Sequence, residues 1–160
     1  MMGASGSKNY RALWIRQAQR LDQFGYFAQY PAKRRTEILR KGYLGSHPPD
    51  QACRIALDLL ARGHYTQTLA CANRLQDEFG IVGDEVRKTL LAVLQEAVPE
   101  SYRPAREVLE PSPGYPFLFQ SSTLNSPIYL KFQIQGGAKR PQLRINSCHK
   151  PDYQESAQFT

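Results

Sequence analysis

The chain has 160 residues, of which 41% are apolar and 17 are aromatic (nine Tyr, seven Phe and one Trp), enough for the core of a single domain. No apolar run approaches the ~20 residues of a membrane-spanning helix, and the start of the chain lacks the apolar segment of a secretory signal. The three cysteines form no Cys-x-x-Cys pair, which argues against a disulfide framework or a zinc site. We therefore expect a cytoplasmic protein with no membrane contact, metal or cofactor.

The net charge of +7 is unevenly distributed along the chain. Residues 1–47 hold nine Lys or Arg against two acids, whereas residues 48–160 hold twelve of each. Within the second part, residues 50–100 carry eight acids against five bases, and residues 103–150 carry seven bases against two acids. Basic surfaces attract polyanions by counterion release, so RNA or another nucleic acid is a candidate partner. Mild basicity without nucleic-acid binding is the competing interpretation.

The first 47 residues are expected to form a basic helical extension. Apolar spacing predicts a helix from Tyr10 to about Phe27, and a shorter helix follows over residues 32–41, AKRRTEILRK. Gly and Pro residues between positions 42 and 49 then break the chain and mark a boundary. The shorter helix carries a run of three cations that is either a solvated face or a nucleic-acid contact. These cations are Lys33, Arg34 and Arg35.

Three further helices are predicted between residues 50 and 98. Their boundaries follow from capping residues, glycines and a proline. These are Asp50 and Gly63 for the first helix, Thr66 or Thr68 and Gly80 for the second, and Asp84 and Pro99 for the third. Cys53 and Cys71 lie on these helices and are expected in the core.

After the third helix the pattern changes to a proline-rich loop and then to strands. The segment YPFLFQSS predicts a strand with Phe117 and Phe119 on one face. Residues 128–150, IYLKFQIQGGAKRPQLRINSCHK, alternate apolar and polar side chains around a Gly-Gly turn, which predicts a β-hairpin. The order favours an α+β domain over residues 48–150, with helices packed on one face of a small antiparallel sheet and a polar tail over 151–160.

The register of the hairpin follows from its turn. If Gln135 pairs with Gln142, then Gln133 lies opposite Arg144, Lys131 opposite Asn146, and Tyr129 opposite Cys148. The solvent face then displays Tyr, Lys, Gln, Arg and Asn side chains, with His149 at the end of the second strand. Such a face could grip a phosphodiester, and it is also what the wet side of any antiparallel hairpin can look like.

The side chains available for chemistry suit a metal-independent ribonuclease. The three histidines have no metal-ligand spacing, and no phosphate-binding loop or nucleophile motif occurs. Metal-free RNA cleavage needs a group that takes the 2′-hydroxyl proton, a group that protonates the leaving 5′-oxygen, and cations for the charge at phosphorus. The candidates are Tyr129, Lys131, Arg144, His149 and Arg103.

Four segments between about residues 51 and 150 carry a family resemblance: LLARGHYTQTLACANRLQDEFGI, VGDEVRKTLLAVLQEAVPESYRP, IYLKFQI and LRINSCHK. Their order resembles the MqsR-type toxins of bacterial toxin–antitoxin pairs, which have a RelE-like fold. The resemblance implies a sequence-selective mRNA interferase, an RNA-binding endoribonuclease neutralised by a partner antitoxin. It implies that Tyr129 is the active-site tyrosine, that His149 or Lys150 is the terminal basic residue, and that Arg103 replaces the family's lysine.

Two departures from the family pattern keep an alternative open. Arginine at position 103 lacks an easily deprotonated amine, and Gln120, nearest to the family's glutamine, is out of register. An inactive relative could bind nucleic acid or a nucleoprotein complex through the basic extension, as an element-borne inhibitor or adaptor. A protein–protein interaction domain with incidental charge is the third interpretation. The expected nucleic-acid contacts are Lys131, Arg144, Lys150, Lys139, Arg140, Lys33, Arg34 and Arg35.

Overall fold

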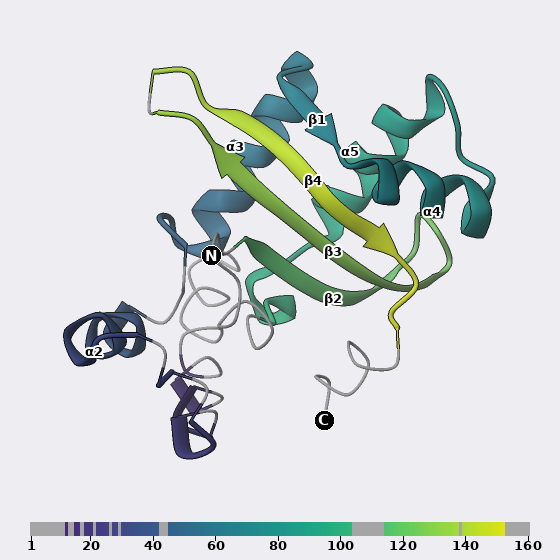
Figure 1. Ribbon diagram of the computed structural model, residues 1–160. Coiled ribbons are helices and arrows are strands. Elements are labelled where there is room, and N and C mark those ends of the chain that lie inside the picture. The colour runs from purple at the N-terminus through teal and green to yellow at the C-terminus, as the bar shows by residue number, and fades with distance from the viewer. Residues whose placement is uncertain are drawn as a thin grey trace.

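The computed structural model has an α+β fold, as expected from the order of helices and strands (Figure 1). It describes residues 12, 15–16, 18–20, 22–25, 27–28, 30–41, 45–103, 114–137 and 139–152. The elements are α2 (Ala32–Lys41), α3 (Pro49–Arg62), β1 (Tyr65–Gln67), α4 (Leu69–Phe79), α5 (Glu85–Glu96), η1 (Pro99–Ser101), β2 (Tyr115–Ser121), β3 (Ser126–Gln135) and β4 (Gln142–His149). Parts of the helix predicted over residues 10–27, and the predicted tail beyond Asp152, lie outside the described residues.

The four strands form one mixed sheet in the order β1-β4-β3-β2. The pairs β2–β3 and β3–β4 are antiparallel, as predicted, whereas β1 runs parallel to β4. The prediction of a wholly antiparallel sheet is therefore wrong at this edge. With only three residues, β1 is too short to show an alternating pattern, and it becomes a strand by pairing with β4.

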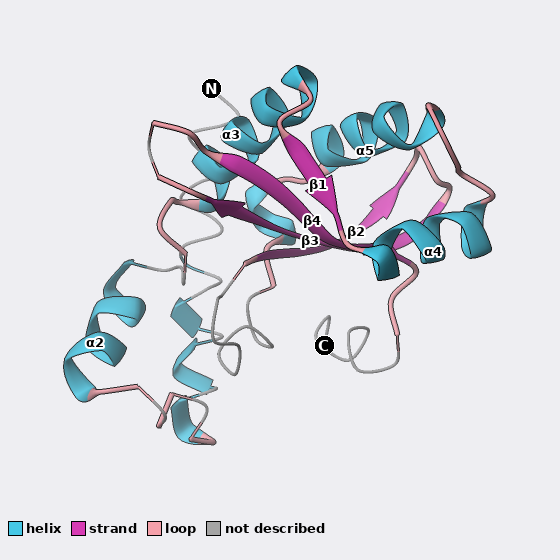
Figure 2. Cartoon of the chain, turned by 45° about the horizontal axis from the view of Figure 1, so that its top comes forward, coloured by secondary structure: helices cyan, strands magenta, loops and turns pink. Residues whose placement is uncertain are grey.

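Helices α3, α4 and α5 cover one face of the sheet (Figure 2). The core between them and the strands includes Leu60, Leu90, Phe117 and Phe132, each at most 1% exposed. The rings of Phe117 and Phe132 stack with centroids 5.8 Å apart. Each such side chain contributes about 1.5–3 kcal/mol when fully buried, so this layer stabilises the sheet. No helix in the described ranges is long and apolar enough to cross a bilayer.

Several predicted boundaries and core positions are confirmed. Gly63 and Gly80 end α3 and α4 in the left-handed conformation, with φ of 80° and 67°. Thr68 caps α4, because its side-chain oxygen accepts a hydrogen bond from the Cys71 backbone N–H. Cys53 and Cys71 are buried, and Phe117 and Phe119 share the core face of β2.

One predicted helix cap is wrong, and one predicted helix end is too late. Helix α3 begins at Pro49, and Asp50 lies in its first turn rather than at the cap. Proline suits the first helical position because its φ is already near the helical value, while the carboxylate still benefits from the helix dipole. Asp84 is the N-cap residue of α5, as predicted, but its side chain makes no capping hydrogen bond. Helix α5 ends at Glu96, before the predicted Val98.

The hairpin register is confirmed at the turn and shifted at the far end. Gln135 pairs with Gln142 and Gln133 with Arg144, as predicted. Beyond them Lys131 pairs with Ser147 rather than Asn146, and Tyr129 with His149 rather than Cys148. The cause is a β-bulge at Asn146, which adds one residue to β4 between Ile145 and Ser147. The bulge turns Cys148 toward the helices and His149 toward the opposite face.

Candidate nucleic-acid interface

The face of the sheet turned away from α3, α4 and α5 is called the open face below. It carries three rows of cross-strand neighbours: Leu118, Tyr129 and His149; Pro116, Lys131 and Ser147; and Gln133, Arg144 and Thr66. The sequences of the four strands contain no Asp or Glu. The strands themselves therefore place no carboxylate beside Lys131 and Arg144 on this face.

The first row brings the two principal candidates together. The rings of Tyr129 and His149 lie side by side across β3 and β4, with centroids 5.6 Å apart. Both side chains are buried, at 4% and 6% exposure. The Nδ1 atom of His149 lies 2.7 Å from the carbonyl oxygen of Lys150. Because a carbonyl can only accept, Nδ1 carries the proton, and in the neutral ring Nε2 holds the lone pair.

The bulge that aligns this row is held from the helix side by Thr68. The Thr68 hydroxyl donates to the Asn146 carbonyl oxygen at 3.0 Å, while its oxygen accepts from the Cys71 N–H at 3.1 Å. The Thr68 backbone N–H also donates to the Ile145 carbonyl oxygen at 3.0 Å. One residue thus joins the end of β1, the start of α4 and the bulge.

The middle of the open face is polar and only partly exposed. The Asn146 amide nitrogen donates to the Gln133 side-chain oxygen at 3.4 Å, and Lys131 beside it is half-buried. The Asn146 side-chain oxygen is buried and lacks a hydrogen-bond partner among the described residues. A buried acceptor without a partner costs about 1–3 kcal/mol, so a ligand N–H at this position would be favoured. Arg144 in the third row is exposed.

Arg103 lies beyond the edge of the sheet, apart from the Tyr129–His149 pair. Its backbone N–H donates to the Pro116 carbonyl oxygen at 2.8 Å, which puts it two strands from Tyr129, roughly 10 Å away. Its guanidinium donates to the carbonyl oxygens of Glu100 and Tyr102 at 2.7 and 2.9 Å. Burial lowers the pKa of this guanidinium from its ordinary value.

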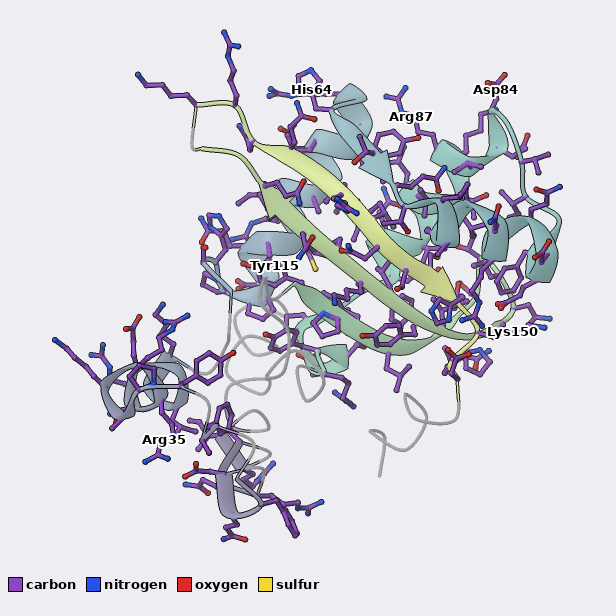
Figure 3. The ribbon with its side chains drawn as sticks, in the orientation of Figure 1. Arg35, His64, Asp84, Arg87, Tyr115 and Lys150 are labelled. Atoms are coloured by element: carbon purple, nitrogen blue, oxygen red, sulfur yellow. The ribbon has the colours of Figure 1, made fainter. Side chains whose placement is uncertain are left out.

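Lys150 is on the helix side of the sheet. Its backbone N–H donates to the Glu78 carboxylate at 2.8 Å, and its Nζ lies 5.6 Å from the centroid of the Phe79 ring. Figure 3 shows it at the end of β4, beside α4. Of the two residues proposed for the terminal basic position, His149 alone therefore faces Tyr129.

The other predicted cations are distributed over two further regions. Arg34 forms an ion pair with Glu37 at 3.1 Å, and Arg35 lies 3.9 Å from Asp22. Lys33, on the same helix α2, is exposed. Lys139 and Arg140 lie in the loop between β3 and β4 and are also exposed. None of these residues belongs to the open face.

The sequence prediction missed the bulge at Asn146 and the hydrogen bond that Thr68 donates to it. A signal for the bulge was present, because the apolar residues of β4 are spaced by two and then by three, at Leu143, Ile145 and Cys148. A strict strand has a spacing of two, so the extra step marks an inserted residue.

In comparisons with known proteins, no family model, no curated protein and no solved structure matches the chain. In the described part of the chain, no group of three or more His, Cys, Asp or Glu residues could hold a metal ion.

Proposed function

We propose that the open face binds single-stranded RNA and that Tyr129 and His149 cleave it without a metal, as in the RelE-like, MqsR-type toxins that the sequence resembles. The observation that carries the proposal is the contact between the two rings, 5.6 Å apart on a face with no strand carboxylate. On this proposal the protein acts in the cytoplasm and is neutralised by an antitoxin partner.

The tautomer of His149 supports an assignment of the two proton-transfer roles. With Nδ1–H bound to the Lys150 carbonyl, Nε2 accepts the proton of the RNA 2′-hydroxyl. The 2′-oxygen forms a bond to phosphorus, the bond from phosphorus to the 5′-oxygen breaks, and a 2′,3′-cyclic phosphate results. The hydroxyl group of Tyr129 donates the proton to the leaving 5′-oxygen. Lys131 in the next row neutralises charge on the phosphate.

Cleavage by purified protein tests this assignment. A synthetic RNA in the presence of EDTA should yield products that end in a 2′,3′-cyclic phosphate. Tyr129→Phe and His149→Gln should each lower the rate about 10²- to 10⁴-fold, the usual contribution of a general acid or base. Tyr65→Phe, on β1 and packed against the core, is the matched control and should cleave normally. Cleavage that survives both substitutions would contradict the assignment.

A second candidate function is nucleic-acid or nucleoprotein binding without cleavage. The burial of Tyr129 and His149 favours it, because a phosphodiester reaches them only after an opening movement at this end of the sheet. The position of Arg103 favours it too, since the Glu100 and Tyr102 carbonyls hold its guanidinium beside η1, two strands from Tyr129. On this alternative the cations of α2 supply the main contact.

The two candidates differ in a binding assay. If α2 is the contact, replacing Lys33, Arg34 and Arg35 with Gln should lower the slope of log K against log salt by up to about 2 for single strands. Lys88→Gln, exposed on α5, provides the control for loss of a cation elsewhere. Binding with an unchanged slope would exclude α2, and binding without any cleavage would favour the second candidate.

A further inference from the structure

A second basic site lies on the helix side of the sheet. A groove of about 990 Å³ opens between α3 and the loop that joins β3 to β4. Figure 3 shows His64 just beyond the C-terminal end of α3, and it lines the groove. Six of its lining residues can bind an anion: His47, Arg54, Arg62, His64, Lys139 and Arg140. Its apolar part includes Ile55, Leu59 and Ile134.

The two walls of the groove are tied to each other. The Leu143 backbone N–H of β4 donates to the His64 carbonyl oxygen at 3.1 Å, just beyond α3. The loop itself is closed by a bond from the Arg140 N–H to the Gly137 carbonyl oxygen at 3.1 Å. Gly136 has φ +79°, and a Cβ there would lie 2.5 Å from the Arg140 carbonyl oxygen, so the turn needs glycine. The groove is therefore a built feature of the fold.

The charge of the groove is strongly one-sided. Its lining has four Lys or Arg side chains and one carboxylate, that of Asp58. Asp58 pairs with Arg62 at 3.2 Å, and Arg54 lies 3.8 Å from Asp50, which is not part of the lining. Lys139 and Arg140 are exposed and make no ion pair with the described residues. Such an arrangement favours a ligand with more than one negative charge.

We propose that this groove binds the phosphates of a nucleotide, with the base on the apolar wall. Arg54, Lys139 and Arg140 surround the phosphates, and the imidazoles of His47 and His64 offer further hydrogen bonds. Ile55 and Ile134 give the base an apolar surface, and the volume falls within the range of small-molecule sites. The nucleotide can be free or can be one unit of an RNA strand, since the chemistry is the same.

This site is separate from the open face and goes beyond the function proposed above. Ile134, in its wall, packs against the core on the helix side of the sheet. It is five residues along β3 from Tyr129, a distance of about 17 Å. The proposal of nucleotide binding in the groove is therefore independent of whether Tyr129 and His149 cleave RNA.

The three histidines allow a direct test, because two line the groove and one lies on the open face. Histidine ring signals of the full-length protein are followed by NMR during titration with ATP and, separately, with a short oligouridine. His47→Gln and His64→Gln assign the two groove signals. We expect ATP to shift the signals of His47 and His64 and to leave that of His149 in place. Lys139→Gln and Arg140→Gln should each weaken ATP binding about fivefold, and the exposed Lys88→Gln of α5 should not.

Each outcome decides a separate point. Shifts of the groove signals with oligouridine as well as ATP assign the site to nucleotide units of a strand, whereas shifts with ATP alone assign it to a free nucleotide. Shifts confined to His149 would contradict nucleotide binding in the groove and leave the proposed RNA site intact. Nucleotide binding in the groove would also be contradicted by the absence of any shift with either probe, or by equal weakening of ATP binding in Lys139→Gln and Lys88→Gln.

Discussion

Thr68 is the residue whose replacement tests how the open face is aligned. Its hydroxyl group makes two hydrogen bonds, one from the Cys71 N–H and one to the Asn146 carbonyl oxygen. Thr68→Ala removes both and leaves the backbone bond to the Ile145 carbonyl oxygen intact. The substitution therefore loosens the start of α4 and the bulge together, without changing the charge or the core.

The expected loss of stability follows from these two contacts. Loss of a threonine N-cap costs about 1 kcal/mol. Loss of the bond to the bulge carbonyl costs about another 1 kcal/mol, so the free energy of unfolding should fall by about 2 kcal/mol. Thr68→Ser keeps the hydroxyl and loses one methyl group, and should cost less than about 1 kcal/mol.

Urea unfolding followed by circular dichroism measures these differences. Thr66→Ala is the matched control, because Thr66 is an exposed residue of β1, two positions before Thr68. In Thr68→Ala the NMR signal of the His149 ring should also move, because the loosened bulge sets the contact with the Tyr129 ring, 5.6 Å away. The reasoning is refuted if Thr68→Ala costs no more than Thr66→Ala, or if Thr68→Ser is as damaging as Thr68→Ala.

Two further predictions concern ionisable groups. Burial on its own raises the pKa of Glu96, but hydrogen bonds from Ser121, Ser122 and Thr123 outweigh it and hold the pKa below its ordinary value of 4.5. Glu96 therefore stabilises the fold above that value and loses this effect as the pH falls through the lower folded pKa. Between about pH 6 and pH 3, the free energy of unfolding of Glu96→Gln should depend less on pH than that of the wild type. The exposed Glu85→Gln is the control. An equal pH dependence of Glu96→Gln and the wild type would count against these hydrogen bonds. Burial also raises the pKa of Cys53 to about 12 and that of Cys71 to about 11, and Cys148 is fully buried. Because the thiolate is the reactive form, Ellman's reagent should label none of the three thiols rapidly in the folded protein. In urea it should label all three. Rapid labelling of one thiol without urea would contradict this.

The sequence was most informative where a local rule determines the backbone. Left-handed glycines end α3 and α4 because no side chain opposes that conformation, and Gly63 and Gly80 could be recognised as stops. The turn of the hairpin likewise set the pairing of Gln135 with Gln142. The strand β1 could not be found in this way, because its three residues are specified by β4, about 80 residues later in the chain.

The bulge at Asn146 shows why the candidate site was harder to predict than the fold. Side chains alternate along a strand, so one inserted residue reverses the face of every residue beyond it. Without the bulge, Tyr129 lies opposite Cys148 and His149 is on the other face; with it, Tyr129 and His149 are neighbours. The hypothesis of a catalytic pair therefore depends on one inserted residue, Asn146. The sequence indicated this insertion only by the three-residue spacing from Ile145 to Cys148.

Arg103 illustrates a different limit. The position of its backbone follows from the strand pairing of Tyr102 with Phe117, but the direction of its side chain depends on the turn η1, which presents the Glu100 carbonyl to the guanidinium. The Nη1 atom donates both hydrogen bonds, of 2.7 and 2.9 Å, so these bonds fix the direction of the guanidinium. They hold it beside η1, two strands from Tyr129. RNA bound to the open face should therefore depend more on Lys131 and Arg144, which lie in the rows beside Tyr129 and His149.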